Sequence, residues 1–409
     1  MTRITTSQEA RRALLLRHEI ALLDLRHEAQ FATAHPLFAA NLAYDRIDLE
    51  AEARLPRKDV KIVLYDDGEG FVADAIKRLS ALGYTNVGTL EGGLQGWRAA
   101  GYELFQDVNS YSKAFGELVE ARRHTPSLPA EDVAVLIEEK ADIAILDARR
   151  FEEYATMNIP GSTSVPGAEL VLRAPQVAHD PDTLIIVNCA GRTRSIIGTQ
   201  SLINAGLPNK VVALRNGTIG WTLAGQDLQH GADRRARIGA SDDAPARARA
   251  VAYKAGVRHV TSADAAVLAD DAARTLYRFD VRSAEEYAAG HIPGFRHYPG
   301  GQLVQETDMA APIRGARILL ADDLGPRADM TASWLGQMGW EVYVLDGGFD
   351  GALETGVPVV NPPADPAHRY KRPYEGTDNA ADAMQAYLDW EFGLVDQLAR
   401  DATHGFFVI

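Results

Sequence analysis

The residue best suited to covalent chemistry in this sequence is its single cysteine, Cys189. It follows residues 184–187, an apolar, β-branched run typical of a buried strand, and Asn188, which ends that run. A short loop then leads into a helical pattern that begins near Ser195 and ends at Gly206. A thiol at such a turn faces backbone N–H groups and the positive end of the helix dipole, a setting that lowers a thiol pKa. The pattern therefore predicts that Cys189 is a nucleophile.

The loop after Cys189 combines small residues, hydroxyl groups and two arginines. A lone cysteine after an apolar strand is often only a small core residue, but two arginines would be poorly placed around a core thiol. We expect the arginines to bind the anionic end of a substrate and the loop amides to cradle a negatively charged sulfur. The hydroxyl groups are expected to bond to that sulfur or to cap the helix. The predicted substrate-binding residues are Ala190, Gly191, Arg192, Thr193, Arg194 and Ser195.

Composition and charge limit the classes of function. The 409 residues are 46% hydrophobic, enough for several buried cores. A net charge of −14 and a pI near 5.3 argue against nucleic-acid or anionic-membrane partners. No uncharged run approaches a membrane span, and charged residues interrupt any signal-peptide core at the N-terminus. One cysteine allows no internal disulfide and no cysteine-based metal site, so we expect a cytoplasmic protein with neither metal nor cofactor.

A pattern of strands and turns occurs three times along the chain. Each copy has an apolar strand ending in Asp-x-Arg, and the position 42 residues after that aspartate follows a second apolar strand. In chain order, each aspartate and its partner position are Asp24 with Asp66, Asp147 with Cys189, and Asp280 with Asp322. Only the central copy has a thiol at this position, whereas the other two copies have a carboxylate. The arginine of the central copy, Arg149, is a further candidate for supporting the site, although we favour an ion pair that holds its own loop.

The repeats predict the fold class and the domain organisation. Strands that alternate with helical stretches, in domain-sized units, are typical of an α/β fold in which each parallel sheet is flanked by helices. Ligand loops of such sheets lie at the carboxyl ends of strands, where Cys189 falls. The predicted organisation is a first domain at 1–106, a linker helix at 107–126, a central domain at 127–227, an exposed linker at 228–257, a third domain at 258–360, and a tail at 361–409.

The combined motifs resemble the rhodanese (sulfurtransferase) domain, in three tandem copies. They comprise Asp-x-Arg, a turn such as Asn158-Ile159-Pro160-Gly161, the cysteine loop, and a glycine-rich stretch that ends at Trp221. The first copy keeps only His-Pro at the turn, and the third lacks the final tryptophan. The resemblance implies that Cys189 takes sulfane sulfur from thiosulfate or 3-mercaptopyruvate, holds it as a persulfide and passes it to cyanide or a thiol. It also implies that the first and third copies are catalytically silent.

Two other classes of function remain open at the level of the sequence. One is a non-catalytic scaffold or regulatory binding protein, against which the basic loop argues. The other is a phosphatase, because that reaction uses the same fold. It needs five residues between cysteine and arginine to wrap an oxyanion, whereas Cys189 and Arg194 enclose four.

The tail at 361–409 contains an amphipathic helical pattern. We expect it to pack across the domains or against a second chain, which would make a homodimer. A neighbouring domain or the tail is also expected to roof the Cys189 loop, because an isolated loop would leave a persulfide open to water.

Overall fold

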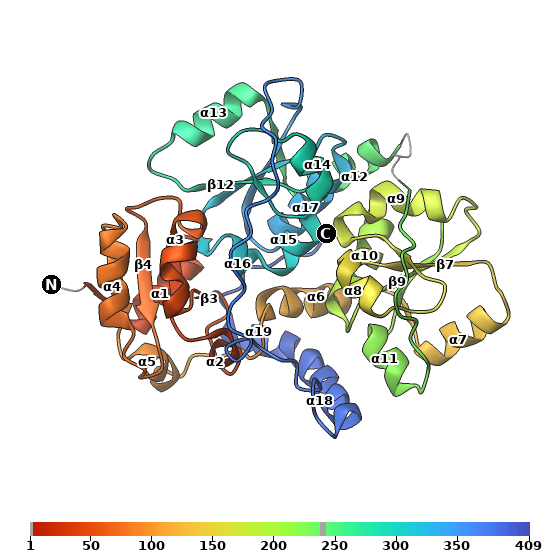
Figure 1. Ribbon diagram of the computed structural model, residues 1–409, viewed down its shortest axis with the longest axis horizontal. Helices are drawn as coiled ribbons and strands as arrows, with labels where there is room; N and C mark the ends of the chain where they lie inside the picture. The colour runs from red at the N-terminus through yellow and green to blue at the C-terminus, as the bar shows by residue number, and fades with distance from the viewer. Residues whose placement is uncertain (1–2, 238–242) are drawn as a thin grey trace.

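Three α/β domains follow one another in the computed structural model, which describes residues 3–237 and 243–409 (Figure 1). Part of the predicted linker, residues 238–242, therefore lies outside the described residues. The first domain comprises β1 (Arg3–Thr5), α1 (Ser7–Leu15), β2 (Ile20–Asp24), α2 (Glu28–Phe31), β3 (Ala40–Asn41), η1 (Tyr44–Arg46), α3 (Ile47–Arg54), β4 (Lys61–Tyr65), α4 (Val72–Ala81), β5 (Val87–Leu90) and α5 (Gly93–Ala99).

The second domain repeats this succession of elements, and the third repeats it with one additional strand and differences in the helices. After α6 (Ser110–Arg123), the second comprises β6 (Ser127–Leu128), α7 (Ala130–Glu138), β7 (Ile143–Asp147), α8 (Phe151–Thr156), β8 (Thr163–Ser164), η2 (Gly167–Glu169), α9 (Leu170–Val177), β9 (Leu184–Asn188), α10 (Thr193–Asn204), β10 (Val211–Leu214) and α11 (Gly217–Leu223). After α12 (Ala244–Lys254), the third comprises β11 (Arg258–Val260), α13 (Ser262–Asp270), β12 (Leu276–Asp280), α14 (Ala284–Ala289), β13 (Arg296–His297), α15 (Gly300–Gln305), α16 (Thr307–Ala310), β14 (Ile313–Arg314), β15 (Arg317–Ala321), α17 (Pro326–Gln337) and β16 (Glu341–Leu345). The tail contains α18 (Ala380–Phe392) and α19 (Leu394–Asp401).

The three sheets share one strand order. They run β1-β5-β4-β2-β3, β6-β10-β9-β7-β8 and β11-β16-β15-β12-β13, and all of these neighbours are parallel. The central strands are apolar along their length because helices cover both faces of a parallel sheet. The predicted fold class is confirmed.

Strand register explains the constant spacing in the repeats. Asp147 at the end of β7 pairs with Asn188 at the end of β9, so Cys189 is the first residue beyond the sheet edge. Asp24 pairs in the same way with Tyr65, and Asp280 pairs with Ala321. The position 42 residues after each aspartate therefore lies beside the Asp-x-Arg turn in all three domains.

The first and third domains share a core that the repeats alone do not reveal. Strand β14 of the third domain pairs antiparallel with β2 of the first, Ile313 opposite Ala21. One continuous cluster of buried apolar residues extends from β2 and β4 to α17 and β15. The two outer domains are thus built against each other, and the second lies beside them (Figure 1).

The segments expected to be linkers are packed elements. Helix α6 buries nearly every residue from Ser110 to Val119 and contacts α10, α15, α18 and α19. Helix α12 packs on α17 through Ala248, Val251 and Ala252. The expectation of an exposed segment was therefore wrong for α12, because its alanine-rich face is an apolar face rather than a solvated one. The domain boundaries themselves stay a prediction.

The tail packs across the domains of its own chain. Residues 361–379, here called the strap, run along the first domain, where His368 accepts a backbone hydrogen bond from Ala29 at 3.1 Å. Leu388, Leu394 and Leu398 of α18 and α19 are buried. Of the two arrangements considered for the tail, the intramolecular one is present. No helix in the described part of the chain is long and apolar enough to cross a membrane.

Tyr111 of α6 is fastened to the third domain through a buried hydroxyl. It donates to the carbonyl of Met338 at 2.8 Å and accepts from Arg314 at 3.1 Å and from Trp340 at 3.0 Å. Tyr111→Phe leaves those two donors unpaired, so we expect a loss of about 1–3 kcal/mol in the free energy of unfolding. Denaturant unfolding measures the loss. Tyr253→Phe, at an 81% exposed position, is the matched control, and an equal loss in both variants would contradict the assignment.

Candidate active site

Cys189 lies where β9 turns into α10, at the carboxyl edge of the second sheet. Its side chain is 2% exposed, and its Sγ lies 3.5 Å from Ser195 Oγ. The Ser195 hydroxyl donates to the carbonyl of Arg192 at 2.8 Å, so its oxygen can accept a hydrogen bond from the Cys189 thiol. Arg192 is the N-cap of α10 and makes no side-chain cap bond. Of the two roles expected of the loop hydroxyl groups, Ser195 makes no cap bond, and its contact with Sγ fits the other role.

The backbone of the cysteine loop is oriented by the start of α11. The amides of Thr218 and Ile219 donate to the carbonyls of Cys189 and Ala190 at 2.9 and 3.0 Å. Gly217 allows this approach, because a Cβ there would lie 2.3 Å from the Cys189 carbonyl oxygen, and its φ is +54°. In a trans peptide the N–H points opposite to the C=O, so the amides of Ala190 and Gly191 face away from α11. These two amides are thus oriented to donate to an anion on that side of the loop.

Arg192 is bonded to protein partners through all three of its side-chain nitrogens. Two of its nitrogens bond to Glu117 of α6, each at 2.8 Å, and a third reaches Asn216 at 3.1 Å. It also pairs with Glu120 and lies 4.0 Å from the ring centre of Phe392 in α18. The geometry does not support the expected role of Arg192 in binding a donor anion. Its role is to fasten the loop to α6 and α18.

Arg194 makes a two-pronged ion pair with Glu153, at 2.8 and 2.9 Å. Burial alone would raise the pKa of Glu153, but the hydrogen bonds and charge of Arg194 lower it to about 2. The third domain has the same pair five positions after Asp322, where Arg327 bonds to Glu286 at 2.6 Å. A pair that recurs in a domain without a cysteine is part of the scaffold. The expected contact of Arg194 with substrate thus gains no support from this geometry.

Arg149 makes the same hydrogen bonds as the corresponding arginines of the other two domains. It bonds to Asp147 at 2.7 Å and to the carbonyl of Met157 at 2.6 Å. Arg26 and Arg282 make the corresponding bonds in the domains that have no cysteine. The arrangement fits the loop-holding ion pair that the sequence favoured, and Arg149 does not line the cavity at Cys189.

The aspartates of the two domains without a cysteine are satisfied by their own loops. Asp66 accepts from the amides of Gly68 at 3.1 Å and Phe71 at 2.7 Å. Asp322 accepts from the amide of Arg327 at 2.8 Å and forms an ion pair with its side chain. In both loops a carboxylate oxygen fills the row of amide donors. The corresponding loop of the second domain has a thiol instead, which leaves room for an anion.

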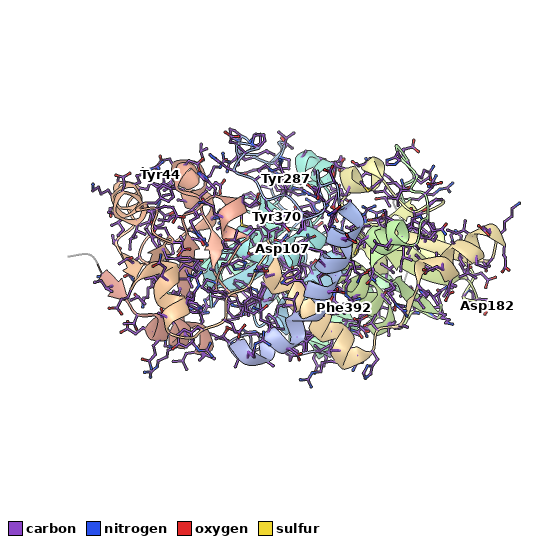
Figure 2. The ribbon with its side chains drawn as sticks, turned by 90° about the horizontal axis from the view of Figure 1, so that it is seen from below. Tyr44, Asp107, Asp182, Tyr287, Tyr370 and Phe392 are labelled. Atoms are coloured by element: carbon purple, nitrogen blue, oxygen red, sulfur yellow. The ribbon has the colours of Figure 1, made fainter. Side chains whose placement is uncertain are left out.

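Cys189 opens into a cavity of about 340 Å³ to which every part of the chain contributes. The first domain and α6 supply Glu28, Asp107 and Lys113, and the third domain supplies Gln302, Gln305 and Glu306. The strap and α18 supply the rest of the far wall: Arg369, Tyr370, Arg372, Tyr374, Glu375, Tyr387 and Glu391. Figure 2 shows Asp107 and Tyr370 near the middle of the molecule, where the Tyr370 hydroxyl donates to Asp107 at 2.8 Å. The expected roof over the loop is thus formed by two neighbouring domains and the tail.

Several charged residues of this cavity were missed by the sequence analysis. Lys113 pairs with Asp107 at 2.8 Å, and Arg372 lies 3.5 Å from Glu375. Arg369 has no ion pair or hydrogen bond within the described residues. Arg150, beside the cavity, lies 3.5 Å from Glu153. No spacing rule links the strap to a cysteine some 180 residues earlier, so the sequence held no signal for these cations.

One group of side chains has the composition of a metal site. Ligand atoms of His27, Asp45 and His368 all lie within 4.8 Å of one another, between the first domain and the strap. The two imidazole rings are stacked, 3.5 Å apart with their planes at 11°. Their in-plane lone pairs therefore run side by side and do not converge on one point. The group is not arranged as a metal centre.

The fold and the site define a class of protein in which tandem α/β domains carry one loop thiol in an amide cradle. The chain belongs to the family of rhodanese-like domains, which it matches at residues 7–100, 129–224 and 263–355. A thiosulfate sulfurtransferase from Pseudomonas aeruginosa, known from its crystal structure, is 49% identical. The match covers 100% of both chains with a TM-score of 0.94. The expectation of a rhodanese-like sulfurtransferase is confirmed.

A second relative matches one domain only. An HTH-type transcriptional regulator from Mycobacterium tuberculosis is 31% identical over 94 residues. Those residues are 23% of this chain and 41% of that protein, so the chain spans less than half the length of this relative.

Glu391 of α18 is an unusual member of the cavity wall, because it is buried and its Oε2 has no hydrogen-bond partner in the described chain. Burial raises its pKa to about 8, with Glu117 and Asp107 adding to the rise and Lys113 and Arg192 opposing it. The pKa is thus higher in the folded protein than in the unfolded chain. The stabilisation from the neutral form is present below about pH 4.5 and is lost as the pH rises through about 8.

Replacing Glu391 by glutamine removes the cost of holding this carboxyl neutral. We expect Glu391→Gln to melt roughly a few degrees above the wild type near pH 7.5, and the difference to vanish as the pH falls towards about 4.5. Thermal unfolding across that range measures the effect. Glu375→Gln, which changes an exposed carboxylate of the same cavity, is the control. A Glu391→Gln variant that melts lower than the wild type near pH 7.5 would contradict the neutral assignment.

Proposed function

We propose that this protein transfers sulfane sulfur from a small anionic donor, thiosulfate in the first place, through a persulfide on Cys189. The observation that carries the proposal is the single thiol at the base of an amide cradle whose counterparts in the other domains hold carboxylates. The full-length similarity to a thiosulfate sulfurtransferase supports thiosulfate over 3-mercaptopyruvate as the donor.

The reaction divides into two half-reactions. The Cys189 thiolate attacks the outer sulfur of thiosulfate, a new S–S bond forms, and the original S–S bond breaks as sulfite leaves with its electron pair. The terminal sulfur of the persulfide carries negative charge and is stabilised by the amides of the 190–195 loop. An acceptor thiolate or cyanide then attacks that sulfur, and Cys189 leaves again as a thiolate. No metal or cofactor takes part in this scheme.

The charged end of the donor binds to cations other than Arg192 and Arg194 of the cysteine loop. Arg192 and Arg194 are committed to Glu117 and Glu153. Arg369 and Arg372 of the strap line the same cavity, and Arg369 has no partner in the described chain. Arginine binds oxyanions through two parallel hydrogen bonds, which suits a sulfonate or a carboxylate. The strap is therefore the proposed anchor for the donor.

The burial of Cys189 at the base of the cavity also bears on the acceptor. Cys189 is almost completely buried, and side chains from all parts of the chain surround its cavity. A small thiol or cyanide fits this space, whereas a cysteine on the surface of a folded protein does not reach the base of it. The proposed acceptor is thus a small molecule. A cytoplasmic location and a homodimer through the tail stay predictions, testable by fractionation and by light scattering.

The persulfide is tested by intact mass after incubation with thiosulfate and, separately, with 3-mercaptopyruvate. We expect the wild type to gain one sulfur and to lose it on addition of cyanide. Cys189→Ser is expected to gain none, because a hydroxyl does not carry sulfane sulfur. Sulfur on the Cys189→Ser protein, or none on the wild type from either donor, would rule out the proposal.

The role of the strap is tested by Arg372→Ala and Arg369→Ala. Loss of a charge-assisted hydrogen bond to the donor is expected to raise the KM for thiosulfate about tenfold per variant, with kcat changed less than about twofold. Steady-state kinetics measures both constants. Arg249→Ala removes an arginine that pairs with Asp346 outside the cavity, and it serves as the matched control. Unchanged KM values in both strap variants would shift the donor site elsewhere.

A further inference from the structure

Glu391 combines deep burial, an unpaired oxygen and a place in the wall of the Cys189 cavity. Its side chain is 2% exposed, and its Oε2 has no hydrogen-bond partner among the described residues. That oxygen lies 3.3 Å from the point where a Cβ on Gly191 would stand. The carboxyl group is thus held directly against the cysteine loop, by a helix that belongs to none of the three domains.

The cations near Glu391 are already paired with other carboxylates. Lys113 of α6 bonds to Asp107, and Arg192 of the loop bonds to Glu117 and Glu120. Tyr387 of its own helix and Tyr374 of the strap face the same cavity and are uncharged near neutral pH, since burial raises the pKa of both. An ionised Glu391 would therefore add a further negative charge to Glu117 and Asp107 without a cation of its own. This surrounding keeps the group as a neutral acid with one O–H to donate.

The donor that enters this cavity is an anion. A neutral carboxylic acid can donate a hydrogen bond to an anionic oxygen, whereas a carboxylate in the same place repels it. On the basis of the proposed function, we propose that Glu391 is a donor-binding residue that acts only while protonated, giving its O–H to an oxygen of the donor. The tail helix thereby decides at which pH the cavity accepts the donor.

Linkage makes this assignment quantitative. If only the protonated form binds, the apparent Kd equals the intrinsic Kd divided by the protonated fraction of Glu391. With a pKa of about 8, donor binding becomes about tenfold weaker between about pH 7 and about pH 9. By reciprocity, donor binding raises the pKa of Glu391. At alkaline pH, binding of the donor is therefore accompanied by uptake of a proton by Glu391. A residue with a merely structural role would change neither quantity.

The test measures thiosulfate binding to the full-length Cys189→Ser protein by calorimetry between about pH 7 and about pH 9. This background removes both turnover and the titration of the thiol. We expect the tenfold rise in Kd, together with proton uptake seen as a difference between two buffers of unlike ionisation enthalpy. The double variant Cys189→Ser/Glu391→Gln is expected to bind at the neutral-pH affinity throughout, because an amide also donates but does not ionise. Glu375→Gln in the same background should keep the rise.

The outcomes separate this inference from the proposed function. A Kd that does not change with pH, or that changes equally with and without Glu391, would overturn the inference. So would a Glu391→Gln protein that does not fold, since a neutral group tolerates the replacement. If the Cys189→Ser protein binds no thiosulfate although the wild type forms a persulfide, no preformed donor site exists and the inference also falls. Absence of sulfur uptake by the wild type would instead defeat the proposed function.

Discussion

The buried guanidinium of Arg192 is the point at which four parts of the chain meet. It comes from the cysteine loop, bonds to Glu117 and Glu120 of α6, reaches Asn216 at the start of α11, and stacks on Phe392 of α18. A buried charge is tolerated only where its partners remain in place, and removal of one partner leaves an uncompensated ion. The position of the loop is therefore tied to the position of the tail. The shape of the cavity depends on the same contacts, because α6 and α18 form two of its walls.

Comparison of the three domains shows which features belong to the shared fold and which belong to the candidate active site. All three share the strand order and the ion pair within Asp-x-Arg, and the second and third also share the pair formed by Arg194 or Arg327. The loops themselves differ, beginning with the first residue beyond the sheet edge. An aspartate there satisfies the loop amides from within, and a thiol leaves them for a ligand. The residue at this position, together with the rest of its loop, thus distinguishes a loop whose amides are filled from one that leaves them for a ligand.

The sequence was sufficient for those features that depend on local pattern or on the repeats. Apolar strands, the turn after β9 and the constant spacing between Asp147 and Cys189 follow from periodicity and register, so the fold class and the place of Cys189 at the sheet edge could be predicted. The roles of Arg192 and Arg194 could not, because their partners Glu117 and Glu153 are distant in sequence. Arg369 and Glu391 were missed because no sequence pattern links the tail to the cysteine loop. Helix α12 was misjudged because alanine and arginine together do not reveal which face is buried.

The strap and α18 follow all three domains in the sequence and form part of the cavity wall. This has a consequence for the order of assembly. During synthesis the second domain, with its thiol, leaves the ribosome well before the strap and α18 exist. At that stage the Cys189 loop lacks Arg369, Arg372 and Glu391, and the ring of Phe392 does not yet cover Arg192. A partly made chain therefore has the thiol without the groups that are proposed to bind its donor. The proposed sulfur chemistry at Cys189 would therefore wait until α18 and α19 have docked, so that the cavity is complete before a reactive sulfur is bound.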